Sequence, residues 1–257
     1  YAHYVPFEPN ATRFATARLT RAFANASDAV VVPTHAMAAH LRQLGVTVRI
    51  EVVPSGIDVA FFGSGRRDAA LRRRLGVAEG EALLLYVGRV AKEKNVELLI
   101  ESLARADDRS LHLIVAGEGP ARQRAEQLAR RLELESRVRF LGAVPRGDLP
   151  ALYANADAFV MPSTTETQGL VLAEALAAGA YIIAADAAPN REVLGLAGEV
   201  VDATPSGFAA AFGTVPRAPL ASVAAAAQAY AETFSLGRQA DRMVAVYRSL
   251  IRPARIA

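Results

Sequence analysis

The 257-residue sequence contains no cysteine. This absence excludes disulfides, thiolate catalysis and zinc sites built on cysteine, and it is compatible with a reducing compartment. No apolar run reaches the ~20 residues that a helix needs to cross a bilayer. The four histidines are scattered except for His35 and His40, whose spacing we interpret as an exposed helix rather than a metal site. The sequence therefore predicts a cytoplasmic protein without a metal.

Charge is nearly balanced, with a formal net value of +3. Basic residues cluster in GRRDAALRRRLG, residues 65–76. Such a run most often forms a solvated helix face, and contact with anionic lipid headgroups is the alternative. A nucleic-acid partner is not expected, because no aromatic residues interleave with the arginines.

Residue 1 is Tyr, and the opening YAHYVPFEPN reads like the interior of a protein. We therefore expect an N-terminal region to precede it. The first 62 residues carry a short helix–strand–helix–strand pattern, which predicts the end of a Rossmann-like N-terminal domain. A ligand-binding domain is predicted at 63–233 and a C-terminal helix at 234–257; the family resemblance described below implies that the domain binds the donor and that this helix packs back towards the N-terminal part, which would be the end of the acceptor domain. The core-facing residues of the helix are predicted to be Met243, Val246, Tyr247 and Leu250.

From residue 83 onward, short apolar runs alternate with amphipathic stretches. The runs lie at 83–88, 111–117, 138–142, 158–162, 181–185 and 199–203. Such alternation predicts an α/β fold in which a doubly wound, Rossmann-like parallel sheet is covered by helices on both faces. Ligands of these sheets bind at the carboxyl ends of the strands, where the glycine-rich segments of this sequence fall.

The first of these strands ends in VGRVAKEKNVELL, with Gly88, Arg89 and Lys94 at the turn into a helix. Free backbone N–H groups and the helix dipole favour negative charge at such a turn, and two cations strengthen the preference. A diphosphate would suit this site. The alternative is that the lysines are exposed and pair with Glu93 and Glu97.

The next two strand ends are less distinctive. Gly117, in AGEGP, permits close approach of the backbone to a ligand, but a strand-to-helix turn opened by Pro120 explains it equally well. A third glycine, which a dinucleotide fingerprint needs, is absent. Val144 and Pro145 could flank an aromatic base or could form an ordinary loop.

Two carboxylates, Glu166 and Glu174, interrupt the apolar segment TETQGLVLAEALAAG. A helix is predicted from Leu170 onward, and an earlier start would bring both carboxylates near one face. Either both are solvated or both point at one ligand. Carboxylates accept hydrogen bonds from sugar hydroxyls, so the strand ends together would suit a nucleotide sugar, which has a base, a ribose, a diphosphate and a second sugar.

In this order, GRVAKEKN, AGEGP, FLGAVP and PSTTETQGLVLAEALAAG closely resemble the C-terminal domain of retaining glycosyltransferases with the GT-B fold. These are the glycogen-synthase-like and phosphatidylinositol-mannosyltransferase-like enzymes, the glycosyl transferases of group 1. The resemblance covers about residues 28–250. It implies transfer of a hexose from a nucleoside diphosphate sugar, such as UDP-glucose, to an acceptor hydroxyl. No Asp-x-Asp triplet occurs, so neither a metal clamp on the diphosphate nor another cofactor is expected.

The resemblance also implies residue roles. Arg89 and Lys94 would bind the diphosphate, Glu166 would contact the donor sugar, and Glu174 would hold the ribose hydroxyls. Further donor-binding residues would be Gly88, Gly117, Val144, Gln168, Gly169 and Leu170.

Gln168 departs from the family pattern, which usually has an aromatic residue there. TETQGLV, together with HYVP upstream, is similar to the subgroup that glycosylates diacylglycerol. This likeness implies a lipid acceptor and a protein at the inner face of the cell membrane, with a sugar acceptor as the alternative. A nucleotide-sugar epimerase, a sugar phosphorylase and a non-catalytic nucleotide-sugar-binding module remain the competing functions.

Overall fold

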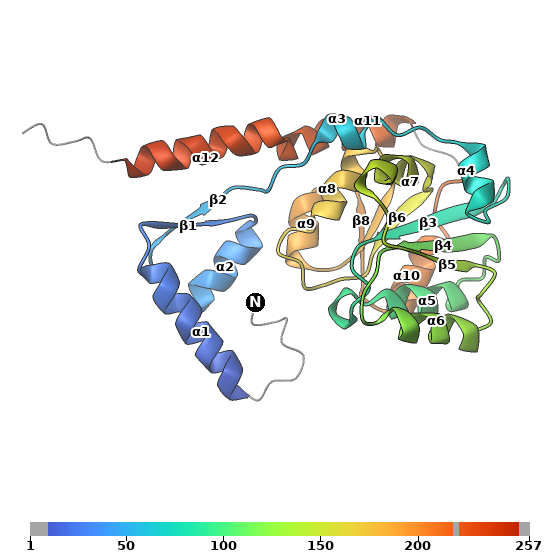
Figure 1. Ribbon diagram of the computed structural model, residues 1–257, viewed down its shortest axis with the longest axis horizontal. Helices are drawn as coiled ribbons and strands as arrows, with labels where there is room; N and C mark the ends of the chain where they lie inside the picture. Colours follow the sequence, from blue (N-terminus) through green and yellow to red (C-terminus); the bar gives the residue numbers. More distant parts are fainter. Residues whose placement is uncertain (1–9, 218–220, 252–257) are drawn as a thin grey trace, which may run out of the picture.

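A computed structural model describes residues 10–217 and 221–251 of the protein. The aromatic segment YAHYVPF and His3 lie outside these residues. The described chain forms a larger body around a six-stranded sheet and a smaller body around a two-stranded sheet (Figure 1).

The larger sheet is parallel throughout, with the strand order β5-β4-β3-β6-β7-β8. Its strands are β3 Ala82–Val87, β4 Leu111–Ala116, β5 Val138–Gly142, β6 Ala158–Met161, β7 Ile182–Ala185 and β8 Glu199–Val201. The chain order reverses between the neighbours β3 and β6, because β3 leads towards β4 and β5 on one side while β6 leads towards β7 and β8 on the other. The doubly wound sheet predicted from the alternating pattern is therefore present.

Helices cover both faces of this sheet (Figure 1). One face carries α5 Val96–Arg105, α6 Arg122–Arg131 and α10 Pro205–Phe212. The other face carries α3 Val59–Phe62, α7 Leu149–Asn155, α8 Leu170–Ala177, α9 Ala188–Leu194 and α11 Ala221–Ala231.

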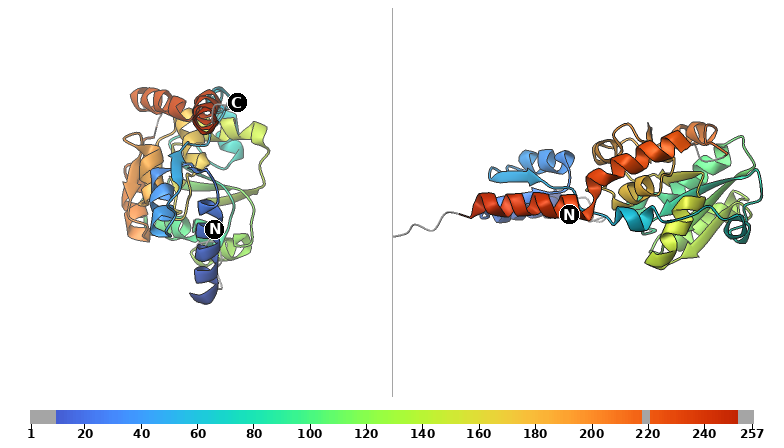
Figure 2. Two further views of the ribbon diagram at one scale, coloured as in Figure 1. Left: turned by 90° about the vertical axis from the view of Figure 1, so that its left-hand side faces the viewer. Right: turned by 90° about the horizontal axis from the view of Figure 1, so that it is seen from above.

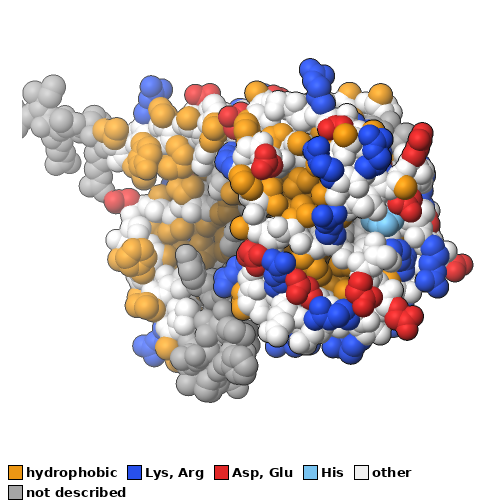
Figure 3. Space-filling view, turned by 45° about the vertical axis from the view of Figure 1, so that its right-hand side comes forward, with side chains coloured by type: hydrophobic (Ala, Val, Ile, Leu, Met, Phe, Trp, Pro, Cys, Tyr) orange, Lys and Arg blue, Asp and Glu red, His pale blue; other side chains and the backbone are white. Residues whose placement is uncertain are grey.

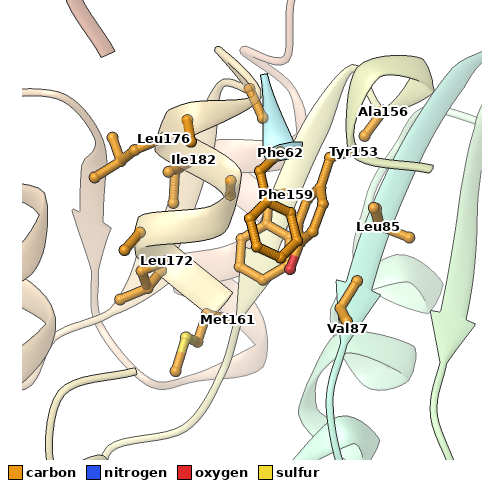
Figure 4. Packing of buried hydrophobic residues seen from close by; sticks show 14 of the residues in the cluster. Phe62, Leu85, Val87, Tyr153, Ala156, Phe159, Met161, Leu172, Leu176 and Ile182 are labelled. Carbon is orange, nitrogen blue, oxygen red and sulfur yellow. The ribbon is translucent and has the colours of Figure 1, made fainter. Parts of the chain in front are cut away.

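Two apolar cores result, one on each face. Along β3, Leu83, Leu85 and Val87 point into the core beneath α8, while Leu84 and Tyr86 point into the core beneath α5. Because both faces are covered, the strand can be apolar throughout, which explains its continuous hydrophobic run. Figure 4 shows the first core, where Leu85 and Val87 of β3 lie near Tyr153 and Phe159, with Leu172 of α8 on the far side.

The smaller body consists of α1 Asn10–Asn25, β1 Ala29–Val32, α2 His35–Gln43 and β2 Arg49–Val52, and its two strands are parallel. Two strands cannot cover all its apolar side chains, so Leu19 and Phe23 are 72% and 78% exposed. In Figure 3 charged side chains spread over the larger body, whereas hydrophobic side chains form much of the visible surface of the smaller one.

The connection between the bodies, residues 53–62, packs partly in the core of the larger body. It contains the short helix α3, and both Ile57 and Phe62 are buried in the core of the larger body. The domain boundary predicted after residue 62 stays a prediction; it assigns Ile57 and Phe62 to the N-terminal part, although both side chains pack in the core of the larger body.

The last helix, α12 Leu236–Leu250, runs from the larger body along the smaller one (Figures 1 and 2). Its start is fixed by hydrogen bonds from Ile57 N to Phe234 O at 2.8 Å and from Leu236 N to Ile57 O at 3.1 Å. Val246 is buried as predicted, but Tyr247 is 60% exposed. The prediction for Tyr247 is wrong because the small body covers only a narrow stripe of this helix.

The basic run 65–76 is likewise only partly a solvated face. Arg73 and Arg74 of α4 Ala69–Arg74 are exposed, but Arg72 is buried and pairs with Asp157, as does Arg67. The hydrophobic pattern alone could not show this, because the carboxylate that pairs with both arginines lies 85 or more positions away along the chain.

Candidate active site

A pocket of about 270 Å³ opens where the chain order of the sheet reverses, at the carboxyl ends of β3 and β6. This is the place where doubly wound sheets bind ligands, because the loops diverge there and leave a crevice. The pocket brings together six of the ten predicted site residues, namely Gly88, Arg89, Lys94, Glu166, Gly169 and Leu170.

The two predicted cations line this pocket in different states. Arg89 is exposed, and no ion pair forms on it within residues 10–217 and 221–251. Lys94 donates from Nζ to Glu166 Oε1 at 2.5 Å, with side-chain exposures of 20% and 10%. The alternative pairing of Lys94 with Glu93 or Glu97 is wrong, since Lys94 has Glu166 as its partner.

The start of α8 adds a third source of positive potential. Gly169 precedes the helix with φ +77°, a left-handed conformation that favours glycine, and no side chain caps the helix there. The first N–H groups of a helix have no intrahelical partners and carry the positive end of its dipole. Since Gly169, Leu170 and Val171 line the pocket with Arg89 and Lys94, its wall is suited to a diphosphate.

Gly117 supports this wall from behind instead of lining it. A Cβ atom on Gly117 would lie 1.8 Å from the carbonyl oxygen of Gly88, and one on Gly119 would lie 2.2 Å from that of Val90. The two loops are also joined by a hydrogen bond from Val90 N to Glu118 O at 2.8 Å. The glycines therefore allow the loop after β4 to pack against the loop that carries Arg89.

Tyr86 is a residue of this pocket that the sequence analysis missed. Its hydroxyl donates to the carbonyl oxygen of Arg89 at 2.8 Å and so fixes the backbone beside the cation. Burial raises its pKa, and the nearby Glu166 and Glu93 raise it further, so it stays a neutral donor. A tyrosine inside an apolar strand looks like core in a sequence, and the only available signal was its place two residues before the Gly-Arg turn.

The two glutamates of TETQGLVLAEALAAG do not share a helix face. The helix begins only at Leu170, so Glu166 precedes it and reaches Lys94, while Glu174 lies within it. The prediction that an early helix start aligns them is wrong, because Gly169 sets a left-handed turn between them.

Glu174 is buried, with 9% of its surface exposed, and accepts a hydrogen bond from the hydroxyl of Tyr153 at 2.8 Å. Desolvation raises the pKa of this carboxyl, and the Tyr153 hydrogen bond and the charge of Arg146 oppose the rise. Arg146 stacks on Phe62 with its guanidinium 5.0 Å from the ring centroid. Val144 is half-buried against the same core.

Gln168 faces away from the pocket. Its side chain is 2% exposed, its Oε1 accepts from Ser55 N at 2.8 Å, and its Nε2 donates to Ser55 O at 3.1 Å. Both polar ends of this side chain are thus occupied by the connection between the bodies, and the donor-binding role of Gln168 stays a prediction.

Within 10–217 and 221–251, no group of three or more His, Asp or Glu side chains is placed to hold a metal ion. Over the same residues, no helix combines the length and the apolar character needed to span a bilayer.

Comparison with known families gives a match to the model of the glycosyl transferases group 1 over residues 68–213. The chain belongs to the group 1 glycosyl transferases. A model of glycosyltransferase family 4 matches residues 1–61. The resemblance noted in the ordered motifs is therefore confirmed.

Among curated group 1 relatives, D-inositol 3-phosphate glycosyltransferase of Geodermatophilus obscurus is 40% identical over 216 residues, which are 77% of this chain and 47% of that protein. Alpha-monoglucosyldiacylglycerol synthase of Streptococcus pneumoniae is 31% identical over 194 residues, which are 72% of this chain and 43% of that protein. The chain thus spans about half the length of these curated relatives.

Solved structures with the GT-B fold superpose closely. Anabaena HepE in complex with UDP and glucose matches with a TM-score of 0.83 and 25% identity, covering 92% of this chain and 67% of that one. Sucrose-phosphate synthase from Thermosynechococcus elongatus matches with the same TM-score and identity, covering 97% of this chain and 65% of that one. The predicted fold class is confirmed.

Proposed function

We propose that the protein is a retaining glycosyltransferase that moves a hexose from a nucleoside diphosphate sugar, with UDP-glucose as the first donor to test, to an acceptor hydroxyl. The pocket at the reversal of strand order carries this proposal, because Arg89, Lys94 and the start of α8 surround one cavity. The likeness to HepE with bound UDP and glucose supports the choice of donor.

The chemistry follows from the charges that develop during transfer. Breaking the anomeric C–O bond leaves negative charge on the departing diphosphate and positive charge on the sugar. Arg89, Lys94 and the N–H groups at the start of α8 would stabilise the diphosphate without a metal, because they are fixed before the bond breaks.

Lys94 and Glu166 would exchange partners when the donor binds. The diphosphate competes with Glu166 for the ammonium of Lys94, and Glu166 is then able to accept hydrogen bonds from the sugar hydroxyls. Glu166 is thereby a sugar-binding residue beside the reacting carbon. It is not one of the paired carboxylates of a glycosidase.

Glu174 would hold the ribose hydroxyls. Its carboxylate is already fixed by the Tyr153 hydroxyl, and the remaining oxygen lone pairs can accept from a vicinal diol. Val144 and Arg146 would lie beside the base of the nucleotide. Both follow β5, and Arg146 is close enough to Glu174 for its charge to lower the pKa of that carboxyl.

The acceptor we favour is a diacylglycerol-type lipid at the inner face of the cell membrane. One relative is named as an alpha-monoglucosyldiacylglycerol synthase, and TETQGL is the sequence feature that pointed to this subgroup. Exposed Arg66, Arg73 and Arg74 could contact anionic headgroups. The D-inositol 3-phosphate glycosyltransferases among the relatives make a soluble sugar acceptor the competing outcome.

Donor binding is tested by the melting temperature of the chain with UDP-glucose, GDP-mannose and free UDP. A ligand at 100 times its dissociation constant should add about 2.7 kcal/mol of stability. Absence of any shift with well-folded protein would reject the pocket as a nucleotide site.

Reaction type is tested by product analysis with radiolabelled donor in the full-length protein. Label transferred to lipid or to a soluble acceptor supports a transferase and identifies the acceptor. Epimerised donor, or binding without turnover, overturns the proposal in favour of an epimerase or a binding module. Flotation with anionic vesicles at low salt, where screening is weakest, tests the membrane.

A further inference from the structure

We propose that Gln168 is a positioning residue that couples occupancy of the donor pocket to the arrangement of the two bodies. The proposal rests on the function proposed above, because the pocket it refers to is the nucleotide-sugar pocket. It assigns a role to a predicted donor-binding side chain that does not line that pocket.

Gln168 makes a matched pair of bonds with a single residue of the connection between the bodies. Its amide oxygen accepts from the backbone N–H of Ser55, and its amide nitrogen donates to the backbone carbonyl of Ser55, at 2.8 and 3.1 Å. The side chain is 2% exposed, so water cannot replace either bond easily. An aromatic side chain has no amide and could not make this donor–acceptor pair.

Two further contacts join the bodies beside this pair. Thr34, which caps α2 and is 1% exposed, donates from Oγ1 to the carbonyl oxygen of Thr167 at 2.8 Å. Glu192 of α9 accepts from the backbone N–H groups of His35 and Ala36, at 2.7 and 3.0 Å. The segment 167–168 therefore holds both the start of α2 and the connection after β2.

The same segment also forms the wall of the donor pocket. Glu166, one residue before Thr167, holds Lys94, and Gly169, one residue after Gln168, begins α8. Thr167 and Gln168 are the two residues between Glu166 and Gly169, so a backbone shift at either end must be taken up by the dihedrals of these four residues.

Donor binding would act on this segment from the pocket side. When the diphosphate takes the ammonium of Lys94, Glu166 changes partner, and the bonds at Thr167 and Gln168 transmit the change to the connection at Ser55. Coupling between two sites is reciprocal, so the hold on Ser55 should in turn change the affinity for the donor.

The test compares Gln168→Glu and Gln168→Met with the matched surface variant Gln127→Glu, on the exposed side of α6. Gln168→Met keeps the length and makes neither bond, while Gln168→Glu keeps the shape and the acceptor but in its ionised form cannot donate to the Ser55 carbonyl, so it is measured at alkaline pH. Far-ultraviolet circular dichroism and thermal melting show whether each variant folds. A partly destabilised variant is measured at low temperature, and failure of both Gln168 variants to fold beside a folded Gln127→Glu would make Gln168 a residue of the core and overturn the coupling.

Two readouts separate coupling from a merely structural role. The first is UDP affinity by titration calorimetry. The second is energy transfer between dyes on Ala39→Cys in α2 and Ala104→Cys in α5, both exposed positions, which a chain without native cysteine makes specific. We expect UDP to change the energy transfer in the parent and in Gln127→Glu. The Gln168 variants should bind UDP about fivefold or more weakly and lose that change.

The outcomes are distinct from failure of the proposed function. Parent-like UDP affinity and a parent-like UDP-dependent change in a folded Gln168 variant overturn the coupling while leaving the function intact. If the parent binds neither UDP nor UDP-glucose, the function and the coupling both fail. The positioning part is then decided by energy transfer without ligand, where a value equal to the parent's rejects it.

Discussion

Both ends of the six-stranded sheet carry charged side chains beside a cavity, but the charges at the amino ends are fully paired and those at the carboxyl ends are not. At the amino ends, beside a cavity of about 210 Å³, the Asp157 side chain is completely buried. It is held by Arg67 at 2.6 Å and Arg72 at 2.9 Å, and it accepts from Leu83 N at 2.7 Å. Arg72 in turn donates to the carbonyls of Asn155 and Glu81, so each charge there is matched by several bonds.

At the carboxyl ends the charged groups make fewer bonds within the protein, so they can still bind a ligand. Lys94 has one carboxylate partner, Arg89 has no ion pair within the described part of the chain, and the start of α8 is uncapped. A cation beside a cavity is thus no sign of a ligand site by itself. The number of bonds already made by each charge distinguishes the structural end of this sheet from the binding end.

The largest expected effect is on stability at the amino ends. Asp157→Ala should lower the free energy of unfolding by about 3–5 kcal/mol, because it leaves buried Arg72 without its counter-charge. Urea unfolding followed by circular dichroism measures this. The control Glu126→Ala removes only a half-exposed surface pair with Arg122 and should cost under about 1 kcal/mol. Similar losses in both variants would contradict the contrast between the two ends.

The next effect is on binding at the carboxyl ends, with little change in stability. A hydrogen bond to a charged group contributes about 1.5–3 kcal/mol, so Arg89→Ala and Lys94→Ala should each weaken UDP affinity about tenfold or more. Calorimetry gives the affinity. The free energy of unfolding, measured in urea, should change by less than about 1 kcal/mol for Arg89→Ala, because Arg89 is exposed. If Arg89→Ala destabilised the chain but left UDP affinity unchanged, Arg89 would belong with the structural cations.

The smallest effect concerns pH. Burial raises the pKa of Glu174, and only its ionised form can accept from both ribose hydroxyls. Affinity for UDP-glucose should therefore fall as pH drops through this pKa, which is raised above the ordinary glutamate value. Glu174→Gln should flatten this fall, and a pH profile of affinity identical to that of the parent would argue against Glu174 as the ribose ligand.

The linked change in stability has the opposite sign. A folded-state pKa above the unfolded value means that the fold favours the protonated carboxyl. The resulting stability is fully present below the unfolded pKa and is lost as pH rises through the folded pKa. The free energy of unfolding, measured across that pH range, should therefore fall more steeply with rising pH in the parent than in Glu174→Gln.

Much of the fold could be predicted because it depends on local pattern. The apolar runs became the six parallel strands, since a strand covered on both faces needs a continuous hydrophobic run and little else. Gly88, Arg89, Lys94, Glu166, Gly169 and Leu170 could be placed together because carboxyl ends of parallel strands share one edge.

The errors concern partners distant in sequence. Arg67 and Arg72 looked like a solvated run until Asp157 was placed beside them, and Tyr247 looked like core until the helix was seen to pass a body of two strands.

The sequence by itself determined the order of strands and helices, the edge at which a ligand would bind and the charges on that edge, because periodicity, glycine and residue type act over a few positions. Only the tertiary structure decided which charges remain available. In it Lys94 pairs with Glu166, Glu174 accepts a hydrogen bond from Tyr153, and Gln168 bonds to Ser55, 113 positions away. The physical reason is that a side chain's role depends on the partners that already satisfy it, and the folding of distant segments against one another supplies those partners.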